Sequence, residues 1–346
     1  MHPLMYVAPL GLLGLGWASL LLGGWWTITL PAVTFGLVPL LELLFPPRPE
    51  PPRKAGSTRL HDLLLLVSLP GQAGLVLLML AMIASGTLTG WEVLGSVLTV
   101  GTACGAFGIN VAHELGHRRE AWAQRTSQVL LLSTLYMHFF IEHNRGHHAN
   151  VATPSDPATS RRGESVYRFW LRSVTGSWRS AWAIEDRRLR RHAHPRLRLD
   201  HALTRFTLIQ TAALSAALVF FGPLATLAWV GSSLIGILLL ETVNYIEHYG
   251  LLRAQKPDGR YERVRPEHSW NADYPIGRSL LFELTRHSDH HAFPGRPYPT
   301  LRHFDDSPQL PTGYPGMILL SLVPPVWFRV MDPHTEREVG RVRAAS

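Results

Sequence analysis

Long stretches without a charged residue constrain the fold of this chain more than any other feature. They occupy positions 4–41, 63–91, 93–112 and 206–240 of the 346 residues. A helix crosses the apolar part of a bilayer with about 20 residues, and breaks rich in Gly, Trp, Thr or Pro divide these stretches into segments of that length. The predicted transmembrane helices, about six in number, are 5–23, 25–45, 63–84, 92–112, 203–222 and 224–246. Buried helices of a soluble protein are the alternative, which this many apolar segments in one chain disfavour.

The distribution of arginine predicts how these helices are oriented. The short turns after the first, third and fifth predicted helices carry neither Lys nor Arg, whereas positions 118–198 and the C-terminal region are strongly basic. Basic loops stay on the cytoplasmic side of a bacterial inner membrane. We therefore expect a single multi-pass domain over 1–346, with both termini and the segments 113–202 and 247–346 on the cytoplasmic side.

Charge and cysteine content narrow the set of partners. The chain has 33 Lys and Arg against 25 Asp and Glu, a net charge of +8. The positive-inside bias and contact with anionic membrane lipids explain this surplus, so it does not indicate nucleic-acid binding. A basic cytoplasmic face also attracts an acidic soluble partner. The single cysteine, Cys104, allows neither a disulfide nor a cysteine-ligated iron module, so any electrons must come from another polypeptide.

Nine histidines gather in four short motifs, HELGH, EHNRGHH, YIEHYG and RHSDHH. Neutral imidazole is the commonest metal ligand, and histidines three or four apart share one face of a helix. First-row metal ions take roughly four to six ligands, so nine imidazoles predict two ions rather than one. The candidate ligands are His113, His117, His143, His147, His148, His248, His287, His290 and His291.

Other interpretations of these motifs remain open at this point. HELGH fits the HExxH signature of zinc proteases, in which Glu114 would be the general base, although the three further motifs disfavour that class. A membrane metal transporter is the non-enzymatic alternative, but it would place ionisable ligands within the spans, where this sequence has almost none. We interpret His138, His268 and His303 as structural. Imidazole binds zinc, copper, iron and nickel alike, so the ligand type does not choose the metal.

Longer motifs around the histidines resemble the membrane-bound alkane 1-monooxygenases of the integral-membrane fatty-acid desaturase and hydroxylase superfamily. The resemblance covers nearly all of 110–333 and rests on NVAHELGHR, HFFIEHNRGHHANVATPSDPA, NYIEHYGLLR, RYERVRPEHSWN, LTRHSDHHA and LRHFDDSPQLPTGYPGM. The NYIEHYG element is narrower than the others and points to the hydroxylase branch. Arg118 and Thr285 depart from the family pattern, in which Lys and Gln are usual. The region before 110 matches mainly in hydropathy.

The resemblance implies an all-α, polytopic membrane enzyme with a cytoplasmic cap that carries a histidine-rich di-iron site. The implied reaction is terminal hydroxylation of medium- to long-chain n-alkanes to 1-alkanols with O2. Electrons would come from rubredoxin and its NAD(P)H-dependent reductase, and the nine histidines would hold two non-haem iron ions. A desaturase, or a hydroxylase of acyl chains or alkyl-aromatics such as xylene, is the alternative on the same scaffold.

Carboxylates next to the histidines are candidates for orienting the imidazoles through hydrogen bonds. They are Glu114, Glu142, Glu247 and Asp289, with Asp156 and Glu164 as further candidates. Solvent-facing charge or helix capping is the alternative role for each of these acids.

An alkane offers nothing to hydrogen-bond, so its recognition depends on buried apolar area, at about 0.8 kcal/mol for each CH₂ group. Small residues on the second predicted helix, Thr34 and Gly36, are expected to leave room for the chain. Close packing between helices is the alternative role for both residues.

Overall fold

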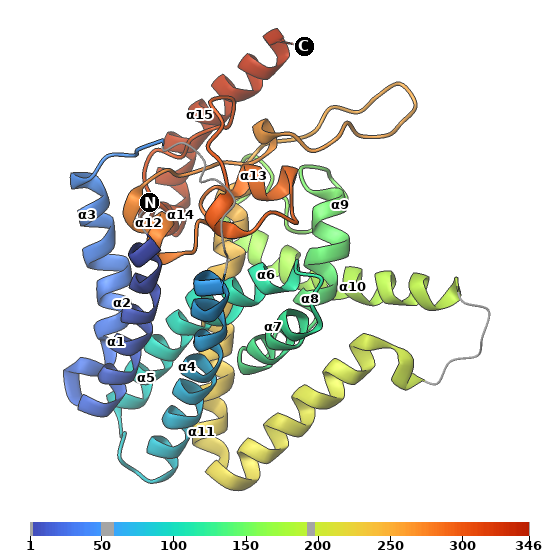
Figure 1. The fold of residues 1–346 in the computed structure, drawn as a ribbon. Coiled ribbons are helices and arrows are strands. Elements are labelled where there is room, and N and C mark those ends of the chain that lie inside the picture. The colour runs from blue at the N-terminus through green and yellow to red at the C-terminus, as the bar shows by residue number, and fades with distance from the viewer. Residues whose placement is uncertain (1–2, 50–58, 192–197, 346) are drawn as a thin grey trace.

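The fold is all-helical. A computed structural model describes residues 3–49, 59–191 and 198–345, and this part of the chain contains no β-strand (Figure 1). Residues 192–197 of the predicted segment 113–202 lie outside the described residues. The α-helices are α1 (Ala8–Leu22), α2 (Thr29–Ala32), α3 (Val38–Leu44), α4 (Arg59–Ala84), α5 (Trp91–Ala103), α6 (Asn110–Gly116), α7 (Ala121–Ser133), α8 (Phe139–Glu142), α9 (His148–Asn150), α10 (Val166–Arg190), α11 (Ala202–His248), α12 (Pro275–Leu280), α13 (His287–Ala292), α14 (Tyr314–Ser321) and α15 (Pro324–Ala345).

Short helical turns complete the described structure. The 3₁₀ turns are η1 (Pro3–Val7), η2 (Gly24–Ile28), η6 (Arg198–Asp200), η7 (Pro266–His268) and η8 (Tyr298–Thr300). Three wider π-helical turns are η3 (Val33–Leu37), η4 (Cys104–Ile109) and η5 (His143–His147). A π-helical turn closes with hydrogen bonds between residues five apart and is frequent at functional sites.

Five helical segments of the described chain are long and apolar enough to cross a membrane. They are Met5–Leu22, Gly24–Leu44, Arg59–Ala84, Trp91–Gly116 and Ala202–His248. The last is α11, whose 47 residues are broken at Gly222, where φ is 81° and Pro223 follows. A glycine accepts this φ without steric cost, and the proline cannot donate the next helical hydrogen bond. The two segments predicted at 203–222 and 224–246 lie on the two arms of α11. The protein is therefore a multi-pass membrane protein.

Small residues let the transmembrane helices approach closely. A Cβ atom on Gly101 of α5 would lie 2.7 Å from the side chain of Ile235 in α11, so only glycine fits there. The core between α4, α5 and α11 contains Met79, Phe107 and Trp229. Trp229 donates its indole N–H to the carbonyl of Ser133 at the end of α7, over 2.8 Å. Large apolar side chains cover the outside of this bundle, as expected for a surface that faces lipid.

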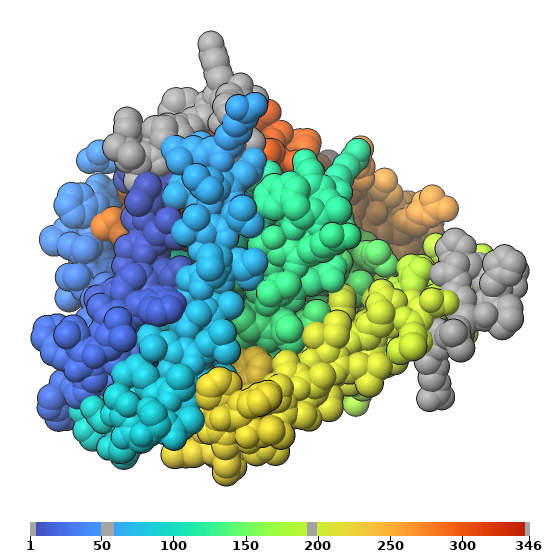
Figure 2. Space-filling view, turned by 60° about the horizontal axis from the view of Figure 1, so that its bottom comes forward, coloured from blue at the N-terminus to red at the C-terminus, as the bar shows by residue number. Residues whose placement is uncertain are grey.

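The two ends of the helical bundle carry different structural elements. The turn between α1 and α2, the turn between α4 and α5, and the break in α11 lie at one end, while α6, α8 and α13 lie at the other (Figure 1). The start of α1 and the end of α15 lie at the same end of the bundle as α6, α8 and α13. Figure 2 shows α7 and the segment that follows it between α4 and the first arm of α11. The histidine motifs are thus brought together at one end of the transmembrane helices.

Candidate metal centre

Four separate segments supply the nine predicted ligands. His113 and His117 come from α6 and the residue that caps it, and His248 ends α11. The second motif runs through η5 into α9, and the last motif forms α13. Seven of the nine side chains are buried, and His117 and His148 are partly exposed. The structure therefore brings together all nine histidines that the sequence predicts as ligands.

The histidines form two groups. The five-histidine group contains His113, His117, His143, His148 and His290, and the four-histidine group contains His147, His248, His287 and His291. The Nε2 atoms of the five-histidine group lie next to one another, with separations of 2.9 Å for His113–His290, 3.1 Å for His117–His143, 3.0 Å for His143–His148 and 3.1 Å for His148–His290. In the four-histidine group the separations are 3.2 Å for His147–His291, 3.2 Å for His248–His287 and 2.8 Å for His287–His291.

Hydrogen bonding alone does not satisfy this arrangement. An Nε2 atom carries one hydrogen or one lone pair in the ring plane, so it serves one hydrogen bond. The Nε2 atoms of His143 and His148 each have two other imidazole nitrogens within 3.1 Å. With metal–nitrogen bonds of about 2.1 Å at right angles, neighbouring ligands lie about 3 Å apart. Both groups fit a set of imidazoles that surrounds a metal ion.

The π-helical turn η5 divides its histidines between the two groups. His148 donates its backbone N–H to the carbonyl of His143, five residues earlier. This pattern brings residues five apart onto one face, so His143 and His148 share the five-histidine group. His147 belongs to the other group, although its spacing of four from His143 would place the two on one face of a regular α-helix.

Burial keeps six of the imidazoles outside the membrane-spanning segments neutral. It lowers the pKa values of His143, His148, His287, His290 and His291 well below the ordinary value. It also lowers the pKa of His117 to about 3. An imidazolium ion loses its hydration in the interior, and the neighbouring imidazoles add to this effect. Neutral imidazole is the form that binds a metal ion.

Two carboxylates touch the histidine groups. Asp156 accepts a hydrogen bond from His147 Nδ1 over 2.9 Å, which leaves the Nε2 atom free to face its group. Burial lowers the pKa of His147, but the Asp156 carboxylate outweighs it and raises that pKa overall. Glu247 Oε2 lies 3.1 Å from His287 Nε2, and its Oε1 accepts from the Tyr314 hydroxyl over 2.7 Å. Tyr314 and its contact with Glu247 had no signal in the sequence.

The other candidate carboxylates have different partners. Glu114 pairs with Arg118 over 2.9 Å, and Asp289 pairs with Arg296. Glu142 is buried and interacts with Ser180, and burial raises its pKa to about 8. The last candidate, Glu164, pairs with Arg172 over 2.7 Å. Within the described residues, none of these four acids forms a hydrogen bond with an imidazole.

Two adjoining apolar cavities lead to the histidines. The inner cavity is lined by Asn110, His113, Phe139, His143, Leu240, Val243, Asn244, Glu247, Leu284 and His287. The outer cavity shares Asn110, Leu240, Val243 and Leu284 with it and extends to Thr34 and Phe35 on η3. Gly36 faces the outside of the same turn, so only Thr34 of the predicted pair lines this path. Phe139, which lines the inner cavity, stacks on His143 with ring centres 4.7 Å apart.

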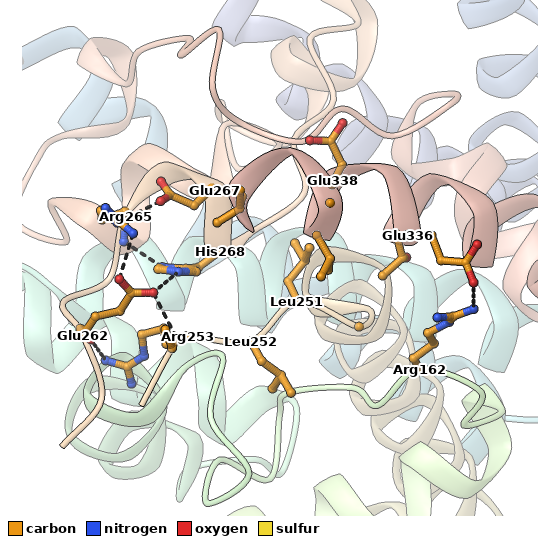
Figure 3. A pocket seen from close by; sticks show the side chains of 16 residues that line it. Arg162, Leu251, Leu252, Arg253, Glu262, Arg265, Glu267, His268, Glu336 and Glu338 are labelled. Atoms are coloured by element: carbon orange, nitrogen blue, oxygen red, sulfur yellow. Dashed lines mark hydrogen bonds and ion pairs between the residues drawn. The ribbon is translucent and has the colours of Figure 1, made fainter. Parts of the chain in front are cut away.

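A larger groove lies elsewhere, between α15 and the segment that follows α11 (Figure 3). Leu251 lies within it, and charged side chains surround it. These charges already pair with one another, Arg265 with Glu262 over 2.7 Å and Arg162 with Glu336. None of the nine histidines lines this groove, so the histidine groups and the apolar cavities remain the candidate site.

Known proteins are similar to this chain in amino-acid sequence over most of its length. The model of the fatty acid desaturase family matches residues 89–321. Alkane 1-monooxygenase 1 of Pseudomonas aeruginosa is 41% identical over 315 residues, which cover 89% of this chain and 82% of that protein. Alkane 1-monooxygenase of Pseudomonas putida is 40% identical, covering 87% and 76%. Alkane 1-monooxygenase 1 of Alcanivorax borkumensis is 40% identical, covering 89% and 78%. The chain belongs to the alkane 1-monooxygenases of the fatty acid desaturase family.

Proposed function

We propose that this protein hydroxylates the terminal methyl group of medium- to long-chain n-alkanes and releases 1-alkanols. The observation that carries the proposal is the apolar path from Thr34 to the histidine groups. The surface that lines this path is almost entirely apolar up to the imidazoles, although Asn110, Asn244 and Glu247 contribute to its walls. Such a path suits a substrate that has no polar group and that reacts at its end.

Two iron ions complete the centre in this proposal, one in the five-histidine group and one in the four-histidine group. The Nε2 separations and the family support iron at these positions. Bound iron supplies the activation of O2 and the oxidising power that an unactivated C–H bond requires. The reaction consumes the alkane, O2, two electrons and two protons, and it yields the 1-alkanol and water.

The residues of the chain position the substrate and exclude water. Leu240, Val243 and Leu284 line both cavities, so they hold the last carbons of the alkane beside the imidazoles. Each buried CH₂ contributes about 0.8 kcal/mol, so the depth of the path sets the preferred chain length. The ring of Phe139 confines the terminal methyl group, which favours attack at the end of the chain.

The electrons come from rubredoxin and its NAD(P)H-dependent reductase in this proposal. The lone cysteine is buried in a transmembrane segment, so the chain supplies no cysteine-ligated iron of its own. The protein lies in the bacterial inner membrane, with the segments 113–202 and 247–346 forming the cytoplasmic catalytic cap. There the histidine groups are close to soluble electron carriers, and the apolar path is close to alkanes dissolved in the bilayer.

Product analysis tests the proposal directly. Membranes that contain the protein are supplied with iron, rubredoxin, its reductase, NADH and ¹⁸O₂, with n-alkanes of graded length as substrates. Acyl lipids and xylene are added as competitors, and products are identified by gas chromatography and mass spectrometry. His143→Ala removes a predicted ligand, and His138→Ala is the matched control because His138 is a partly buried histidine five residues away that belongs to neither group.

The expected product is ¹⁸O-labelled 1-alkanol from the wild type and from His138→Ala, and none from His143→Ala. Alkene would identify a desaturase, and product from xylene or acyl lipid alone would identify one of the related hydroxylases. Either outcome would overturn the alkane assignment.

A further inference from the structure

Helix α10 lies crosswise to the transmembrane helices (Figure 1). It follows the end of the bundle that carries the histidines, and it packs on α8 and α11. Its 25 residues extend about 37 Å. Transmembrane helices run along the membrane normal, so a helix that crosses them at their end is parallel to the membrane surface.

The sequence of α10 repeats every 11 residues. Tyr167 and Arg168, Trp178 and Arg179, and Leu189 and Arg190 form three pairs in which an apolar residue precedes an arginine. Eleven residues are about three helical turns, so each kind of residue forms its own row along the helix. The two rows are neighbours, because successive residues are about 100° apart.

Five of the six side chains in the two rows are exposed in the described structure, and Leu189 is partly buried. The opposite face of α10 is buried, through residues such as Phe169, Ser173 and Ala181. In the apolar row, Trp178 is 50% exposed, and Leu171, on the same face, is 74% exposed. Exposed apolar side chains beside a buried face are costly in water but favourable in a bilayer.

The arginine row has no ion-pair partner in the part of the chain that the structure describes. Arg168, Arg179 and Arg190 are exposed and form no ion pair with the described residues. By contrast, Arg172 and Arg188 of the same helix pair with Glu164 and Glu185. The helix therefore carries two arginines that pair with carboxylates and a row of three that form no ion pair with the described residues.

We propose that α10 is an interfacial helix that binds anionic phospholipids. Its apolar row enters the acyl-chain boundary, and the row of Arg168, Arg179 and Arg190 binds lipid phosphate groups just above it. A basic row beside an apolar row on a helix parallel to the membrane is the arrangement that such helices use. An acidic soluble protein would match the arginines, but it would leave Leu171 and Trp178 without apolar cover.

This binding fixes the level of the histidine groups in the membrane. Ile184 of α10 packs close to Gly146 in η5, and Glu185 pairs with Arg145 over 3.5 Å. A lipid-bound α10 thus contacts the turn that carries His143 and His147. The proposal depends on the fold alone and holds whichever substrate the enzyme oxidises.

Spin labels on the full-length protein in nanodiscs test where α10 lies. Single cysteines replace Leu171 or Trp178, and Cys104 is buried, so the wild type is the labelling blank. Phe220→Cys, on the outer surface of a transmembrane segment, gives the lipid reference, and Asp305→Cys gives the water reference. The accessibility of each label to O2, which partitions into lipid, is compared with its accessibility to a water-soluble nickel chelate.

Labels at 171 and 178 are expected to resemble the lipid reference rather than the water reference. If the labels at 171 and 178 behave like Asp305→Cys, α10 is not in the interface and the proposal is wrong.

Lipid selectivity tests the arginine row. The triple variant Arg168→Gln, Arg179→Gln and Arg190→Gln is compared with Arg260→Gln, Arg263→Gln and Arg337→Gln, which removes the same charge elsewhere. The readout is the association of spin-labelled phosphatidylglycerol relative to phosphatidylcholine. The α10 variant is expected to lose about fivefold in this ratio for each arginine that holds a phosphate. Equal losses in both triple variants would mean that only total charge matters and would overturn the proposal.

Discussion

The contact between Asp156 and His147 gives the most specific prediction about the metal centre. Asp156 is fully buried, and Oδ2 accepts from His147 Nδ1 over 2.9 Å and from the Thr159 hydroxyl over 2.6 Å. Its Oδ1 accepts from the backbone N–H of Ala158 over 3.1 Å. All three neighbours are donors, so the site requires a side chain with two acceptor oxygens.

Asp156→Asn cannot meet that requirement. If the amide oxygen faces His147, the amide nitrogen faces the Ala158 N–H, and two donors oppose each other. If the amide is reversed, its nitrogen donates to His147 Nδ1 and moves the ring hydrogen to Nε2, which then cannot bind a metal ion. Loss of a carboxylate partner of a metal-binding histidine typically costs 10- to 100-fold in metal affinity or activity, or about 1.4–2.7 kcal/mol.

The assay is iron bound per chain as a function of buffered free iron. Asp156→Asn is expected to bind the iron of the four-histidine group, to which His147 belongs, 10- to 100-fold more weakly. Glu164→Gln is the matched control, because Glu164 is also buried but pairs with Arg172 rather than with an imidazole. Wild-type affinity in Asp156→Asn would refute the reasoning. An equal loss in Glu164→Gln would show that both substitutions act through general destabilisation.

Three further predictions concern the path, the helix packing and the ligands. Thr34→Trp should shift the preferred alkane to shorter chains, at about 0.8 kcal/mol for each CH₂ excluded. Gly36→Ala, on the outer side of the turn, should leave the product ratios across a chain-length series unchanged. A shift in both variants would place the effect outside the cavity. Gly101→Val should lower the free energy of unfolding by about 1–3 kcal/mol through overpacking against α11. The loss should appear as a lower midpoint of thermal unfolding in detergent, and an unchanged midpoint would contradict the close approach of the two helices. His143→Ala should reduce the iron bound per chain and His138→Ala should not, as measured by elemental analysis, and iron loss in both would argue against the ligand assignment.

The sequence was sufficient for the helical class and for the candidate ligands. Apolar length predicts transmembrane helices, and closely spaced histidines mark candidate ligands, because both signals are local. The break in α11 was also predictable, since Gly222 and Pro223 are adjacent in the chain. The division of His143, His147 and His148 between the two groups was not predictable, because it depends on a π-helical turn that spacing does not reveal.

The roles of the acids show the limit of reasoning from neighbours in sequence. Glu114 and Asp289 stand beside predicted ligands, yet each points to an arginine. Asp156 is nine residues from His147 and reaches it only because the chain folds back after α9. The apolar residues that line the path carry no signal of their own, since Leu240 and Leu284 resemble every other leucine in the transmembrane helices.

The three π-helical turns make this protein unusually sensitive to the loss of single residues. Each contains one residue more than the corresponding α-helical turn, and the three carry Thr34 in η3, Gly105 in η4, and His143 with His147 in η5. Deleting one residue from such a turn would give a more regular helix and rotate everything beyond it by about 100°. In η4 that rotation would turn His113 and His117 away from their group while the helix itself became smoother. In η4 and η5, helical regularity therefore opposes the grouping of the histidines, which requires the extra residue.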